Sequence, residues 1–328
     1  MSNAPSSAKE HWYNIASLAL SVVVVYLLVQ DANTKDVASI LATADWFWLV
    51  VAMLIKLLSL CIHEYRLWLA IHPPRPSITT TMQIGFASAC INLVFPARAG
   101  DILTIAWLQR TCALPTSVAT YAVGMASFFE AALFGLIMMA MLLFHWDFWS
   151  ELLGHIHLQM FHTITLLTLG GIAVILLVAI VGKRWLREEN TADIDAPFSI
   201  QQLIRETVVH THQGLSNIGY LTQHIVFSAI EVWLMIASFA LGFSVIGLDI
   251  AGPWMISGII LGISAISSVV LPPTYGAGHA AASVFLLGLC NIDSSIAIAY
   301  ATLWWLISQI PTALVGIPCI LRIQKQRK

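Results

Sequence analysis

The chain has 328 residues, of which 59% are hydrophobic and only 10% are charged, and its formal net charge is −2. This balance excludes an ordinary soluble domain and is typical of an integral membrane protein. The near-neutral charge and the lack of a basic region also exclude nucleic acid as an expected partner.

Six apolar runs reach the length of about 20 residues that a helix needs to cross a bilayer. In chain order they lie near residues 12–30, 46–71, 117–144, 161–182, 223–246 and 295–320. We expect each of them to form a full transmembrane helix. The first run is long for a signal peptide, and Leu27–Ala32 offers no good cleavage site, so we interpret it as an anchor.

Two further apolar regions, 78–112 and 255–291, are interrupted by proline and glycine. The same spacing of Ser-Ala, Pro and Gly occurs in both: Ser88, Pro96 and Gly100 in the first, and Ser264, Pro272 and Gly276 in the second, with Gly278 close behind. Broken helices are tolerated at membrane depth where they are buried in protein or line a wet cavity. The repeated pattern predicts two re-entrant hairpins in an inverted repeat around a central site.

The lysine and arginine residues predict the orientation of the spans. In the loops 31–45, 145–160 and 247–254 the only basic residue is Lys35. The opposite ends of the spans carry most of the lysine and arginine residues. By the positive-inside rule, both termini are then cytoplasmic. The first hairpin has arginines at both ends and the second has no basic residue, so we expect them to enter the membrane from opposite faces.

We expect a single integral membrane domain over residues 1–328, with a first half over 12–182 and a second half over 223–320. Residues 183–222 form the only long polar stretch, and we interpret them as a cytoplasmic connector. Apolar residues from Phe198 to Val208 recur there with roughly helical spacing, which predicts a helix at the membrane interface. The connector is too short for a soluble catalytic domain.

No catalytic or metal-binding motif in the sequence is complete. His63-Glu-Tyr-Arg-Leu67 resembles the start of H-E-x-x-H, but leucine stands where the second histidine is needed. Glu64 and Arg66 lie near the cytoplasmic end of their span, so we interpret them as interface residues whose side chains reach toward water. We predict that the protein is no enzyme and binds neither a metal ion nor a cofactor.

Ionisable residues inside membrane spans are functional candidates because their burial is costly. Arg98 and Asp101 follow the first break, close to Asn92 and Gly100. A guanidinium there is suited to bind a phosphate through two parallel hydrogen bonds, and the helix that starts near Asp101 adds free N–H groups. Alternatively, Asp101 is an ordinary helix cap and Arg98 is a positive-inside anchor.

Three more ionisable residues are candidates for lining a polar path or taking up a proton. Glu130 and Glu231 are each the only acid in their helix interior, and His279 starts the return limb of the second hairpin. Either acid could pair with Arg98 or Lys56. A purely structural ion pair is an equal alternative for the two acids, as is a satisfied polar residue for His279.

One run carries a family resemblance. Asn92-Leu-Val-Phe-Pro96-Ala-Arg98-Ala-Gly100-Asp101 fits N-x-x-x-P-x-R-x-G-[DE], and it is preceded by Arg66-Leu-Trp68 and followed by Leu271–Gly278. Together these segments resemble the lysylphosphatidylglycerol synthase transmembrane, or flippase-like, family over about residues 12–320. The resemblance implies an inner-membrane protein that moves, or helps to move, lipids or lipid-linked intermediates between leaflets. It also implies a match of Glu130 to the acid in the next helix.

We therefore expect an inner-membrane translocase that holds an anionic headgroup near Arg98. Its substrate would be a phospholipid or a polyprenyl-linked lipid. The alternative is a non-transporting membrane subunit that docks a lipid-modifying or glycosyl-transferring envelope enzyme, and a third hypothesis is a proton-coupled transporter of a small solute. Thr104, Ala131 and His279 stand where the family often carries charged residues, which favours the second hypothesis.

Overall fold

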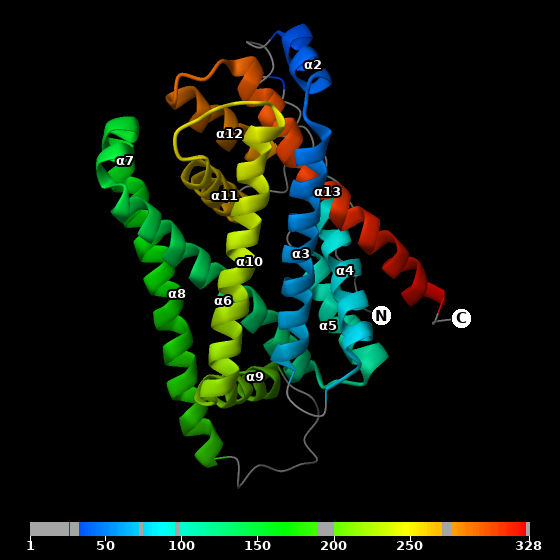
Figure 1. Cartoon of the computed structure of the whole chain (residues 1–328). Coiled ribbons are helices and arrows are strands. Elements are labelled where there is room, and N and C mark those ends of the chain that lie inside the picture. The colour runs from blue at the N-terminus through cyan, green and yellow to red at the C-terminus, as the bar shows by residue number, and fades with distance from the viewer. Residues whose placement is uncertain are drawn as a thin grey trace, which may run out of the picture. The chain divides into compact units, whose positions relative to one another are not determined.

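In a computed structural model of the chain, the structure describes Tyr26 and residues 33–71, 75–95, 99–188, 200–270 and 277–325. Within these ranges all regular secondary structure is helical, which confirms the predicted all-α class (Figure 1). Several predictions fall outside the described residues: most of the span at 12–30, and Pro96, Arg98, Pro272 and Gly276.

Among the described residues, five helices are long and apolar enough to cross a membrane. They are α3 (Trp46–Ala70), α6 (Thr116–Phe144), α8 (His155–Glu188), α10 (Ile218–Val245) and α13 (Ser294–Lys325) (Figure 1). Each coincides with one of the predicted apolar runs. The chain is therefore a multi-pass membrane protein.

Shorter helices occupy the two interrupted apolar regions. The first contains α4 (Ile78–Val94) and α5 (Ala99–Cys112), and the second contains α11 (Pro253–Val270) and α12 (Ala277–Leu289). Helix α11 packs against α12. The residues between the two helices of each region, 96–98 and 271–276, lie outside the described part of the chain. Their re-entrant path and the inverted repeat remain predictions.

Three other helices complete the described part of the chain. They are α2 (Thr34–Ala42), α7 (Trp146–Leu153) and α9 (Ile200–Ser216). Helix α9 lies within the polar connector, where the sequence predicts a helix. It packs against α6 and α8 (Figure 1). Glycine allows the close approach: a Cβ at Gly182 of α8 would press on the backbone of Val208 in α9.

The chain divides into two compact units, and boundaries between them fall within α3, α4, α10 and α13. The first comprises Met1–Met53, Leu93–Ala97 and Ile236–Ile310, and the second comprises Leu54–Asn92, Arg98–Met235 and Pro311–Lys328.

Aromatic stacking holds the interior of the first unit. The ring of Tyr300 stacks on Phe243 with centroids 4.2 Å apart, and Trp304 stacks on Phe239 at 4.4 Å. The buried Tyr300 hydroxyl donates a hydrogen bond to the carbonyl of Phe239 at 3.1 Å. A buried phenol in an apolar interior needs such a partner, so this bond fixes α13 against α10.

The second unit is built around an apolar cluster to which α3, α4, α5, α6 and α13 contribute. Fully buried members include Ile84, Leu108 and Ala122. On α13, a Cβ at Gly316 would meet the Phe86 carbonyl and Cys90 of α4, so the two backbones approach closely there. Close packing of this kind drives helix association in lipid, where apolar burial alone gives little gain.

Candidate functional site

Polar residues form a stripe along α3. Lys56, Ser59, His63 and Arg66 follow one another at intervals of three or four residues, which places them on one face of the helix. The side chain of Arg66 is fully buried, and Glu64 is only 3% exposed. The interpretation of Glu64 and Arg66 as interface residues was therefore wrong, because the surrounding helices of the second unit enclose both side chains.

The α3 stripe meets carboxylates from two other helices. His63 Nδ1 lies 2.9 Å from Oε1 of Glu231 on α10 and 3.4 Å from Oε2 of Glu130 on α6. The Arg66 guanidinium pairs with the other oxygen of Glu231 and also donates to the Ala126 carbonyl. We call His63, Arg66, Glu130 and Glu231 the charge cluster. It ties α3, α6 and α10 together inside the second unit.

The salt-bridge partners of Glu231 belong to the charge cluster itself. Glu231 forms salt bridges with His63 and Arg66. The predicted alternative of a pairing with Arg98 lies outside the described residues. Donor atoms of His63, Glu130 and Glu231 all lie within 4.8 Å of one another, which is close enough to hold a metal ion. Because Arg66 already provides a fixed positive charge there, we interpret the group as an ion-pair network rather than a metal centre.

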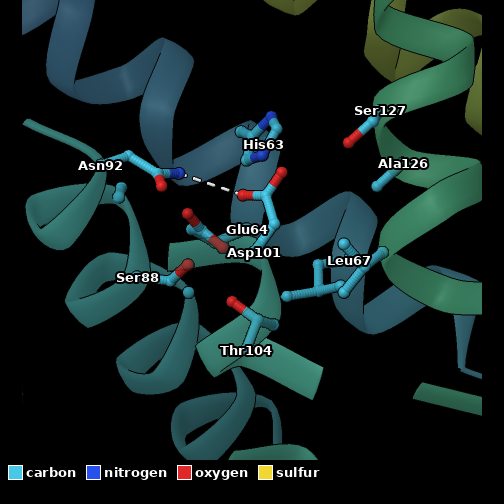
Figure 2. Close-up of a pocket in the computed structure, with 12 residues that line it drawn as sticks. His63, Glu64, Leu67, Ser88, Asn92, Asp101, Thr104, Ala126 and Ser127 are labelled. Atoms are coloured by element: carbon cyan, nitrogen blue, oxygen red, sulfur yellow. Dashed lines mark hydrogen bonds between the residues drawn. The ribbon is translucent and has the colours of Figure 1, made fainter. Parts of the chain in front are cut away.

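A pocket opens beside the charge cluster, between α3, α4, α5 and α6 (Figure 2). Most of its lining is polar or small: His63, Glu64, Leu67, Gly85, Ser88, Ala89, Asn92, Asp101, Thr104, Val123, Ala126 and Ser127. The carboxyl group of Glu64 lies directly against Gly85, where any Cβ would collide with it. His63 belongs to both the pocket and the charge cluster, so it connects the two.

Asn92 fastens the end of α4 to the first turn of α5. Its Oδ1 accepts a hydrogen bond from the Gly100 backbone N–H at 2.7 Å. Its Nδ2 donates to Asp101 Oδ1 at 3.0 Å (Figure 2). A Cβ on Gly100 would overlap the Ser88 carbonyl, so glycine is needed for this approach. We call these contacts of Asn92 with Gly100 and Asp101 the Asn92 clamp. The spacing of the motif thus allows Asn92 to form hydrogen bonds with Gly100 and Asp101.

The Asn92 clamp predicts a specific pattern of stability. Asn92→Asp removes the donor to Asp101 and places two carboxylates together, so we expect a loss of about 1–3 kcal/mol of unfolding free energy. The double variant Asn92→Asp with Asp101→Asn restores one amide and one carboxylate and should recover most of the loss. Thermal unfolding of the purified protein in detergent measures this. Equal stability of the single and double variants would contradict the clamp.

The structure places the remaining predicted site residues as follows. Asn92, Gly100 and Asp101 come together at the pocket, and Glu130 meets Glu231 around His63. His279 lies in the first unit, in the first turn of α12, with its ring centroid 3.8 Å from that of Trp304. Gly278 beside it is buried.

Sequence reasoning missed the central role of His63 and Arg66. His63 was considered only as part of an incomplete zinc motif, and Arg66 was assigned to the interface. The signal that could have found them is helical periodicity, because they share one face with Lys56 and Ser59. A polar face on an otherwise apolar span indicates a partner inside the bundle.

These features define a multi-pass helical membrane protein with a buried charge cluster and an adjoining polar pocket. The profile of the lysylphosphatidylglycerol synthase TM region matches residues 14–316, and the chain belongs to this family. The match confirms the resemblance found in the sequence and indicates a membrane protein of lipid metabolism or translocation. A search of curated proteins gives no significant match.

Proposed function

We propose that this protein translocates a lipid or a lipid-linked intermediate between the leaflets of the inner membrane. The observation that carries the proposal is the polar pocket of the second unit, which places Glu64 and Asp101 among helices of an otherwise apolar protein. Ionisable groups are expensive in such surroundings and mark paths for polar substrates. Membership of the family supports the same function.

Only the headgroup of a lipid needs a polar route across the membrane. The acyl chains remain in hydrocarbon throughout, so a polar pocket among transmembrane helices is sufficient for the headgroup. Glu64 and Asp101 offer carboxylate acceptors, while Ser88 and Thr104 contribute hydroxyl groups to the lining. This set suits a headgroup that carries hydroxyl or ammonium donors. We assign recognition of its phosphate to Arg98, as the sequence predicts.

Translocation in reconstituted vesicles tests the proposal. The protein is incorporated into vesicles with a headgroup-labelled fluorescent phospholipid, and a membrane-impermeant quencher reports the label that reaches the outer leaflet. We expect wild type to accelerate exchange, and Glu64→Gln or Asp101→Asn to slow it at least about tenfold, the cost of one hydrogen bond to a charged group. Arg98→Ala should abolish exchange.

Glu151→Gln is the matched control, because Glu151 is exposed on α7 and is not part of the pocket lining. We expect the Glu151→Gln variant to accelerate lipid exchange as much as the wild-type protein does. If the wild-type protein fails to accelerate lipid exchange and copurifies with a stoichiometric enzyme, the proposal of a translocase is wrong. The protein is then a membrane subunit for a lipid-modifying or glycosyl-transferring partner.

A further inference from the structure

A second polar stripe, on α10, leads to the charge cluster and takes no part in the pocket. His224, Ser228 and Glu231 are separated by four and three residues, so they lie on one face of the helix. His224 and Ser228 are fully buried. Both ring nitrogens of His224 and the hydroxyl of Ser228 lack a hydrogen-bond partner in the described part of the chain. We call His224, Ser228 and Glu231 the α10 stripe.

The surroundings of His224 do not explain its burial. Its ring lies 5.2 Å from Phe129 and 4.3 Å from Tyr220, measured between centroids. A neutral imidazole carries one donor and one acceptor, and each costs about 1–3 kcal/mol when it is buried unsatisfied. An apolar side chain would fill this site without that cost. An uncompensated histidine inside a membrane bundle therefore points to a polar species that visits it.

The unsatisfied atoms continue from His224 into the charge cluster. Arg66 is fully buried, and its Nε also lacks a partner. Residues at these helical intervals lie about 5–6 Å apart between Cβ atoms, a distance that one water molecule spans with two hydrogen bonds of about 2.8 Å. The α10 stripe is thus spaced for a chain of water-mediated bonds that ends at Glu231 and His63.

The charges of the four cluster residues indicate which species such a chain would deliver. Glu130 and Glu231 carry two negative charges, and Arg66 returns one positive charge. A single added proton on His63, or on a carboxylate facing it, brings these four residues to neutrality. Other charged and titratable groups surround these residues. Lys56 and Glu64 on α3 interact with Glu130 and Glu231, and Asp101 on α5 interacts with Glu64. On the route, His224 faces Arg66, Arg75 and the ring of Tyr220. Counted over its own four residues, the charge cluster is therefore one proton short of neutrality.

We propose that the charge cluster is a proton-binding site and that the α10 stripe is its route for protons. On loading, a hydronium ion on the stripe gives its proton to His63 or to a facing carboxylate and leaves water behind. On release, the proton returns to water, so no electron changes hands. Because His63 also lines the headgroup pocket, proton binding is placed to drive headgroup movement. This coupling rests on the proposed translocase function, whereas the proton site does not.

Infrared difference spectroscopy tests the proton site without any lipid substrate. Spectra of the purified full-length protein at about pH 5 and about pH 8, which bracket the ordinary titration of imidazole, should show carboxyl and imidazole bands. We expect these bands to shift or disappear in His63→Gln and in Glu231→Gln. Difference spectra that are the same in wild type and both variants would overturn the proton site.

The vesicle assay with a transmembrane pH gradient tests the route and the coupling. Wild-type exchange should change at least about threefold with the gradient, which corresponds to less than 1 kcal/mol. Ser228→Ala and His224→Phe should lose this response. Ser117→Ala is the matched control, because Ser117 is a buried serine on α6 whose hydroxyl also lacks a partner in the described structure.

The outcomes separate the two proposals. Exchange that ignores the gradient in wild type, or a response that survives in both stripe variants, overturns the proton route but leaves the translocase intact. If the wild-type protein shows no lipid exchange, the proposed translocase function and its coupling to protons are both rejected. The infrared spectra then test the proton-binding site by themselves.

Discussion

Arg66→Met is expected to lower the free energy of unfolding by about 3–5 kcal/mol, the cost of leaving one member of a buried ion pair without its partner. Arg66 is fully buried and Glu231 is only 3% exposed, so no long side chain from the surface can replace the guanidinium. The Ala126 carbonyl would lose its donor in the same variant.

Thermal unfolding of the purified protein in detergent measures this effect. The double variant Arg66→Met with Glu231→Gln removes both charges and should recover much of the loss, because a neutral amide is cheaper to bury than a carboxylate. Arg322→Met is the control. Arg322 is exposed near the end of α13, and its replacement should change stability by no more than about 0.5 kcal/mol. A loss for Arg66→Met as small as this control would refute the buried pair.

The long helices were predictable because their signal is local. Each needs only about 20 consecutive apolar residues, and α3, α6, α8, α10 and α13 all coincide with such runs. The breaks at Pro96 and Pro272 stay predictions, because both prolines lie outside the described residues. The helix in the connector followed from the spacing of its apolar residues.

The partners within the site were harder to predict because they depend on how distant helices rotate about their axes. Glu231 is separated from His63 by 168 residues in the chain, and no local pattern pairs them. Periodicity gives the face of α3 on which His63 and Arg66 lie, but the helix that this face meets is set by packing over the whole unit. The Asn92 clamp is intermediate, because its two sides are close in sequence and the motif records their spacing.

Two glycines inside helices are expected to respond differently to replacement by alanine. A Cβ on Gly100 in α5 would overlap the Ser88 carbonyl and would lie 2.7 Å from Asn92 Oδ1. The carbonyl belongs to the backbone of α4, so it cannot move without separating the two helices. A Cβ on Gly124 in α6 would meet no atom within 4 Å. Steric crowding decides the first case and backbone entropy the second.

We expect Gly100→Ala to destabilise the protein by about 1–3 kcal/mol through overpacking, and to cost more where the Asn92 clamp opens as well. Gly124→Ala should instead be neutral or raise stability by up to about 1 kcal/mol, because alanine loses less conformational freedom in a helix. Thermal unfolding of both variants in the same detergent gives the comparison. If Gly100→Ala is as stable as Gly124→Ala, α4 and α5 do not meet at Ser88 and Gly100, and the pocket between them lacks the wall that Asn92 and Asp101 provide.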